Sequence, residues 1–249
     1  MKKIVVLGNP HTGTSILKCI IGHIDDVYEV IEEKKFITKK MIGIAKKEKK
    51  KYVLIKYPRL NESILEDYED YIKICIIRHP IFTINSLKKR EVNFFKSWVY
   101  RYEKSAEVFL NKNEKLNDIY YIKYEDIFKN NYSDLKKILD SIGLIYTDKI
   151  FNNQSFINKL YKYERLSEVK EYDKTKMMDI MNTDLSPKEK HEILRTYQIN
   201  QPFINNNNNS EIILTKEEAK LIHSRRTIRN LYNLKKINFD NFDISMLHI

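Results

Sequence analysis

The sequence predicts an α/β fold: a doubly wound, mainly parallel sheet with flanking helices and a helical C-terminal extension. Short segments rich in Ile and Val alternate with helical patterns between residues 3 and 145. The strand-like segments lack polar alternation over much of their length, which is typical of a sheet covered by helices on both faces. A loop containing two glycines joins the first strand to the first helix, the arrangement found at ligand sites of doubly wound folds.

Four strands are expected, and each ends at a glycine, a proline or the start of a polar segment. The first ends at Gly8, the second before Pro58 and the third before Pro80. The expected strands comprise residues 3–8, 52–56, 72–78 and 118–123.

Helical periodicity predicts the connecting elements. Apolar residues recur at helical spacing in 14–24 and 132–142, and Gly143 suits the position after a helix end. Weaker helical patterns occupy 186–197 and 215–232. A stripe with helical spacing is expected to pack in the core and comprises Phe94, Phe95, Trp98, Tyr102, Ala106, Phe109 and Leu110.

Composition limits the class of protein and of partner. The 249 residues are 42% hydrophobic, which is enough for a globular core. A net charge of +11 predicts an anionic partner, although a lysine-coated soluble surface explains part of the excess.

Two cysteines, Cys19 and Cys75, lie within apolar runs and are expected to be buried thiols in a reducing compartment. The apolar run at residues 4–7 is too short for a signal peptide, and no stretch reaches the length of a membrane span. The sequence therefore predicts a soluble cytoplasmic protein without a membrane span.

The loop from Gly8 to Ser15 has the spacing of a phosphate-binding loop, with four residues between Gly8 and Gly13. Nucleotide-hydrolysing loops place a lysine after the second glycine and then a magnesium-binding hydroxyl. Thr14 replaces that lysine, so a site for a triphosphate with magnesium is disfavoured and no metal is expected. A tight turn without a ligand is the alternative.

Other polar residues follow the expected strands. Lys56 and Arg78 end the second and third strands, and Ser86 lies eight positions after Arg78 on the next helix. The carboxyl ends of parallel strands meet at one crevice, so these residues should face the glycine loop. A guanidinium and a hydroxyl are suited to a phosphate group.

The glycine loop resembles the 5′-phosphosulfate loop of sulfotransferases that use 3′-phosphoadenosine 5′-phosphosulfate (PAPS). Two positions depart from the family pattern, because His11 replaces a Lys or Arg and Thr12 replaces a Ser. An imidazole is largely neutral at pH 7, so His11 would donate to the bridging oxygen only when protonated or in the right tautomer. The resemblance implies that Pro10, His11, Thr12, Gly13, Thr14 and Ser15 bind the co-substrate.

Three further segments resemble elements of the same family. Arg78, Pro80 and Ser86 match its 3′-phosphate motif without substitution. Tyr124 begins a Tyr-Glu-Asp-Ile segment whose tyrosine would lie near the adenine and whose acidic pair would be structural. Lys56 begins a Lys-Tyr-Pro segment similar to the one beside the transferred sulfuryl group, and the alternative for Lys56 is a strand-end lysine extending to solvent.

The resemblance also suggests a general base. Glu32 is the expected base with Glu33 as its substitute, while a solvated acidic and basic face is the alternative for this segment. Near the C-terminus, Arg225, Arg226 and Arg229 could reach the 3′-phosphate, and an exposed basic helix face is the favoured alternative.

The resemblance as a whole implies one sulfotransferase-like domain over residues 1–249, with a nucleotide-binding core at 1–145 and a helical extension at 146–249 acting as an acceptor-side lid. PAPS would be the co-substrate and PAP the product. The acceptor would be a sugar, small alcohol, lipid or tyrosine, or an amine. A small-molecule kinase and a non-catalytic binding protein are the alternatives; nucleic acid is not expected because no motif for it is present.

Overall fold

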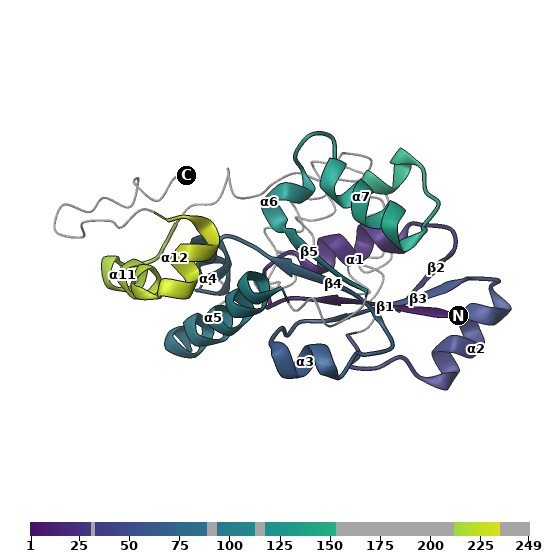
Figure 1. Cartoon of the computed structure of the whole chain (residues 1–249), viewed down its shortest axis with the longest axis horizontal. Coiled ribbons are helices and arrows are strands. Elements are labelled where there is room, and N and C mark those ends of the chain that lie inside the picture. The colour runs from purple at the N-terminus through teal and green to yellow at the C-terminus, as the bar shows by residue number, and fades with distance from the viewer. Residues whose placement is uncertain (31–32, 89–93, 113–117, 153–211, 235–249) are drawn as a thin grey trace, which may run out of the picture.

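Five parallel strands form the central sheet of the computed structural model, which describes residues 1–30, 33–88, 94–112, 118–152 and 212–234 (Figure 1). The strand order is β2-β3-β1-β4-β5, so the first strand lies in the middle. This sheet confirms the predicted fold class and all four predicted strands. The strands are β1 (Lys2–Leu7), β2 (Val27–Glu29), β3 (Tyr52–Tyr57), β4 (Ile72–Ile77) and β5 (Ile119–Lys123).

Helices cover both faces of the sheet, because alternate side chains of each strand point to opposite sides. Val5 and Leu7 of β1 belong to one core and Ile4 and Val6 to the other. The second core is closed by α1 (Thr14–Gly22), α6 (Tyr124–Ile127), α7 (Ser133–Ile142) and the 3-10 turn η1 (Asp148–Phe151). The first is closed by α2 (Lys39–Lys47), α3 (Glu62–Glu66), α4 (Pro80–Lys88), α5 (Phe95–Asn111), α11 (Lys216–Ser224) and α12 (Arg226–Tyr232).

The predicted aromatic stripe lies on α5, and only some of its residues are buried in the core. Tyr102 and Ala106 are buried, as expected, but Phe94 is 70% exposed and Leu110 is 42% exposed. Phe94 precedes the first turn of α5 as its N-cap residue, and Leu110 occupies the last turn. The prediction was wrong for these two end residues because helical spacing does not show how far along the helix the core extends.

Two elements at one edge of the sheet are not evident from hydrophobic patterns. Strand β2 has only three residues, and α2 is dominated by lysines. Short elements of this kind are fixed by their neighbours, since β2 pairs with β3 from Val27 to Glu29.

The predicted 215–232 helix is two helices, α11 and α12, separated by Arg225 in an extended conformation. Helix α11 packs against α4 and α5, and α12 packs against α5. The Ile213 amide donates to Asn85 Oδ1 at 2.7 Å, and Lys88 pairs with Glu218 at 2.6 Å. The expected helix at 186–197 lies outside the described residues. Residues 212–234 are thereby attached to the helix that carries Ser86.

Both cysteines are buried and neither forms a disulfide within the described ranges, as the sequence predicts. Within the described ranges, no helix is both long and apolar enough to cross a membrane.

Candidate functional site

The candidate site lies at the carboxyl ends of three adjacent strands. The loop from Gly8 to Gly13 follows β1, Lys56 lies near the end of β3, and Arg78 directly follows β4. Since β3 and β4 pair with β1 on either side, the three segments meet at one edge of the sheet. This is the location where ligands bind in open parallel sheets.

Internal hydrogen bonds fix the phosphate loop. Thr12 donates from both its amide and its hydroxyl to the Asn9 carbonyl, at 3.2 and 2.7 Å. Asn9 Nδ2 in turn donates to the carbonyl of Arg101 on α5 at 3.3 Å. The loop therefore adopts its shape through contacts within the described chain, and a ligand need not order it.

Gly13 is required by the geometry at the end of the loop. Its φ of 98° lies in the left-handed region, and a Cβ atom there would overlap the Tyr124 ring. Gly13 is also the N-cap of α1, where no side chain caps the helix and no acidic residue occupies the first turn. Amide groups at such a helix start attract an anion.

The loop contacts the α4 segment through a short hydrogen bond. His11 Nδ1 lies 2.7 Å from Ser86 Oγ, and Arg78 Nη1 donates to the His11 carbonyl at 3.5 Å. The two predicted phosphate-binding motifs, separated by 75 residues at His11 and Ser86, are thus in direct contact. The sequence places them in one crevice, and the structure adds that His11 connects them.

Arg78 is only 8% exposed, and its surroundings hold the guanidinium in place. Its Cζ lies 4.6 Å from the centre of the Tyr124 ring. Tyr102 and Thr83 both donate their hydroxyl groups to the Arg78 carbonyl. Burial lowers the pKa of Arg78 from its ordinary high value. An anion bound beside this charge would offset the cost of its burial.

Buried aromatic residues surround the end of β4. His79 packs 5.1 Å from the Tyr232 ring of α12, and its backbone amide donates to Glu125 Oε1 at 2.8 Å. The pKa of His79 is lowered to about 3, mainly by burial. Smaller contributions come from positive charge at His223, Arg78 and Lys123. His79 is therefore neutral near pH 7 and joins α12 to the site.

Lys56 lies between a hydroxyl and a carboxylate. Its Nζ donates to Ser15 Oγ at 2.9 Å and pairs with Glu33 Oε1 at 2.6 Å. Glu33 was the substitute for Glu32 as general base, and Glu32 lies outside the described residues. The structure therefore brings Ser15, Lys56 and Glu33 together at the edge of the phosphate loop.

The C-terminal arginines make contacts within the protein. Arg225 pairs with Glu103 on α5 at 3.4 Å, and Arg229 donates to the His223 carbonyl. Arg226 is exposed. These contacts fit a role in attaching the C-terminal helices more closely than a role in binding phosphate.

Sequence patterns gave no role to Asn9 or Tyr102 in the site. Asn9 is only 6% exposed and joins the loop to α5, and Tyr102 is buried against the Arg78 carbonyl. Tyr102 falls in the aromatic stripe, where helical spacing indicates core packing only. The tyrosine hydroxyl is the feature of the sequence that could have indicated a contact of this kind, because a buried tyrosine hydroxyl requires a hydrogen-bond partner.

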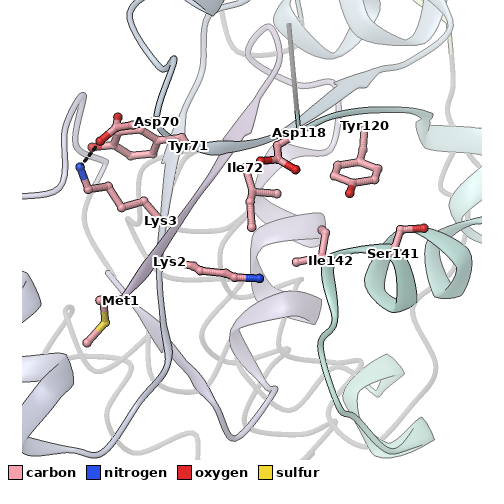
Figure 2. A pocket seen from close by; sticks show the side chains of 10 residues that line it. All are labelled: Met1, Lys2, Lys3, Asp70, Tyr71, Ile72, Asp118, Tyr120, Ser141 and Ile142. Atoms are coloured by element: carbon pink, nitrogen blue, oxygen red, sulfur yellow. Dashed lines mark hydrogen bonds and ion pairs between the residues drawn. The ribbon is translucent and has the colours of Figure 1, made fainter.

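A pocket of about 340 Å³ lies at the opposite, amino-terminal ends of the strands (Figure 2). Lys2, Asp118 and Tyr120 line it, and Lys3 and Asp70 at its rim pair with each other at 2.5 Å. None of the predicted site residues lines this pocket.

Among the described residues, no cluster of three or more His, Cys, Asp or Glu side chains could hold a metal ion.

Comparison with solved structures identifies the architecture. The mouse sulfotransferase SULT7A1 complexed with PAP aligns over 93% of this chain and 88% of its own, with a TM-score of 0.51 and 13% identity. The sulfotransferase domain of the Synechococcus PCC 7002 olefin synthase aligns over 95% and 96%, with a TM-score of 0.50 and 14% identity. The chain has the sulfotransferase fold.

A third domain with this fold, the sulfotransferase domain from the curacin biosynthetic pathway, aligns over 94% of this chain and 97% of its own. Its TM-score is 0.50 and its identity 12%. No family model matches the sequence, and no curated protein matches it. The comparison of structures thus identifies the fold at 12–14% sequence identity.

Proposed function

We propose that this protein is a sulfotransferase that moves the sulfuryl group of PAPS to a hydroxyl or amine acceptor, with PAP as the product. The observation that carries the proposal is the contact of His11 with Ser86 beside Arg78. This contact joins a loop suited to a 5′-phosphosulfate to a pair suited to a 3′-phosphate. One of the proteins with the same fold, the mouse enzyme, was solved with PAP.

The nucleotide would be held by groups of different kinds. The amides at the start of α1, with the Thr14 and Ser15 hydroxyls, suit the 5′ side. Arg78 and Ser86 suit the 3′-phosphate, and Tyr124 marks the adenine side next to Gly13. All of these donors are neutral hydrogen-bonding groups or a guanidinium, so binding needs no metal ion.

Bound PAPS would supply an activated sulfuryl group beside Lys56. We assign Lys56 to the developing negative charge on the sulfuryl and bridging oxygens, and His11 to the bridging oxygen that departs with the electron pair. Glu33 would accept the proton of the acceptor hydroxyl as the hydroxyl oxygen bonds to sulfur, because its ion pair with Lys56 places the carboxylate beside the proposed transfer site.

Calorimetry with PAP, compared with ATP and magnesium, tests the proposal. We expect PAP to bind equally well with and without EDTA, and more tightly than ATP with magnesium. A loss of nucleotide binding in EDTA, or a preference for ATP with magnesium, would instead support a kinase.

We further assign the chain to the cytoplasm, because both cysteines are buried and neither forms a disulfide within the described residues. The contacts of α11 with α4 and α5, and of α12 with α5, support one domain over residues 1–249, whose C-terminal part would serve as the acceptor-side extension.

A further inference from the structure

A dense group of lysines follows Glu33 along the chain. Residues 33–51 contain nine lysines and two glutamates, so they carry +7 of the net charge of +11. We call these nine side chains the lysine ribbon. Its members are Lys34, Lys35, Lys39, Lys40, Lys46, Lys47, Lys49, Lys50 and Lys51.

Only part of the lysine ribbon is used within the protein. Lys35 pairs with Asp67 at 2.9 Å, Lys50 donates to the Asp25 carbonyl at 2.6 Å, and Lys51 pairs with Asp26 at 2.8 Å. These contacts attach both ends of the ribbon to the fold. Five lysines between them are exposed and form no ion pair within the described part of the chain, namely Lys39, Lys40, Lys46, Lys47 and Lys49.

Two of these five lysines oppose the stability of their own helix. Lys39 and Lys40 occupy the first turn of α2, directly after the N-cap Thr38. The start of a helix carries partial positive charge, so cations there are unfavourable. A bound anion would reverse the sign of this contribution, which indicates a ligand-binding role for this turn.

The apolar side of α2 is already covered by protein. Ala45 is fully buried and Met41 packs against the same core, while the preceding Phe36 lies 5.7 Å from the Tyr68 ring. A helix that lies on a membrane inserts such a face between the lipids. Since α2 uses this face for packing, the lysine ribbon is suited to a soluble polyanion.

The lysine ribbon extends away from the proposed transfer site. It starts beside Glu33, which pairs with Lys56 near the carboxyl end of β3, and it ends at Lys51, directly before β3 begins at Tyr52. The two ends of the ribbon are therefore separated by about the length of β3, about 20 Å for its six residues. A ligand that contacts the whole ribbon and also reaches the proposed transfer site must be an extended chain.

Lysine side chains attract anions without fixing their register, because each is a point charge on a flexible stem. A polysaccharide acceptor can bind in several registers along the ribbon, because every sugar offers hydroxyl groups to the transfer site. A peptide with a single acceptor tyrosine would need one fixed register. We infer that the lysine ribbon binds an acidic polysaccharide and that this polymer is the acceptor. The inference rests on the proposed sulfotransferase function and narrows its acceptor to one class.

Binding of hyaluronan oligosaccharides, whose charge comes from carboxylates alone, tests the inference. We expect calorimetry to detect hyaluronan but not neutral dextran of equal length, with an affinity that falls as salt rises. The double variant Lys39→Gln with Lys40→Gln should bind about 3- to 10-fold more weakly. Its thermal midpoint should stay equal or rise, because two unfavourable charges leave the helix start.

Lys149→Gln with Lys220→Gln is the matched control, since both lysines are exposed and lie outside the ribbon. An equal loss in this control would overturn the inference, as would tighter binding of phosphatidylserine vesicles or single-stranded DNA than of hyaluronan. PAP is titrated into the same samples. If the protein binds PAP but does not bind hyaluronan, the inferred acceptor class is wrong and the sulfotransferase proposal stands. If it binds hyaluronan but does not bind PAP, the sulfotransferase proposal is wrong.

Discussion

His11 Nδ1 and Ser86 Oγ lie 2.7 Å apart, so the loop after β1 and the helix after β4 share one hydrogen bond. A 3′-phosphate that binds Ser86 would compete with His11 for the serine hydroxyl. The imidazole would then be available to the 5′ side of the nucleotide. Phosphate bound at one half of the proposed site would thereby change the hydrogen-bond partner of His11 in the other half.

Arg78→Ala should weaken PAP by about 10- to 100-fold, because a charged hydrogen bond is worth about 1.5–3 kcal/mol. Adenosine 5′-phosphate lacks the 3′ group, so its affinity should change little. Titration of wild type and variant with both nucleotides gives the double difference. Equal losses would assign Arg78 to the fold or the 5′ side, and a wild-type protein indifferent to the 3′-phosphate would exclude the sulfotransferase.

His11 should affect turnover more than nucleotide affinity, because its donor matters most when charge develops on the bridging oxygen. His11→Ala should lower turnover about 100-fold with little change in PAP affinity. His11→Lys supplies a permanent charge at the same position and should remain active. Loss of activity in His11→Lys together with full activity in His11→Ala would show that the imidazole is not at that oxygen.

Glu33→Gln should lower kcat by at least about 100-fold while PAP affinity persists, because the amide cannot take the acceptor proton. Glu48→Gln is the control, since Glu48 is an exposed residue at the end of α2. Steady-state rates with a transferable acceptor and PAP calorimetry separate the two effects. If kcat is unchanged in Glu33→Gln, another group is the general base.

Gly13→Ala should disrupt the phosphate loop, because alanine is strained at φ 98° and its methyl group would overlap the Tyr124 ring. We expect PAP binding to be lost and the thermal midpoint to fall. Gly43→Ala provides a matched control, since no atom lies within 4 Å of a Cβ at Gly43 within α2. That change should stabilise the protein by about 0.5–1 kcal/mol. Similar effects of the two substitutions would contradict the described loop.

The stability of the fold should fall as the pH is lowered below 6.5. The pKa of His79 is about 3 in the folded protein and about 6.5 when unfolded, so the unfolded chain binds the extra proton between these values. The contribution is fully present above pH 6.5 and decreases as the pH approaches 3. At pH 5 it amounts to a loss of about 2 kcal/mol.

Denaturant unfolding of wild type and His79→Leu from pH 5 to 7.5 measures this contribution. His79→Leu should make the profile flatter, since leucine fills the buried position without a proton to bind. His223 has a pKa lowered by burial as well, so part of the slope should remain. An unchanged slope in His79→Leu would show that the imidazole does not titrate as described.

Four of the five strands could be predicted because they are largely apolar, whereas β2 has only three residues and could not. The glycine loop could be predicted because its spacing is local. Arg78 and Lys56 were located by strand ends, which parallel topology brings together. The His11 to Ser86 contact and the support of Arg78 by Tyr102 could not be predicted, because both depend on packing between residues distant in sequence. The pairing of Glu33 with Lys56 could not be predicted either, because the sequence of this segment fits a solvated charged face equally well.

The attachment of α4 to residues 213 and 218 means that the helix carrying Ser86 gains these contacts late in protein synthesis. A ribosome releases the phosphate loop, β4 and Ser86 well before these later residues emerge. Until then, Asn85 and Lys88 lack their partners from the C-terminal helices. If the proposed site binds PAP, nascent chains should consequently bind it weakly until α11 and α12 have left the exit tunnel, and co-substrate capture would be a late event in the biogenesis of the protein.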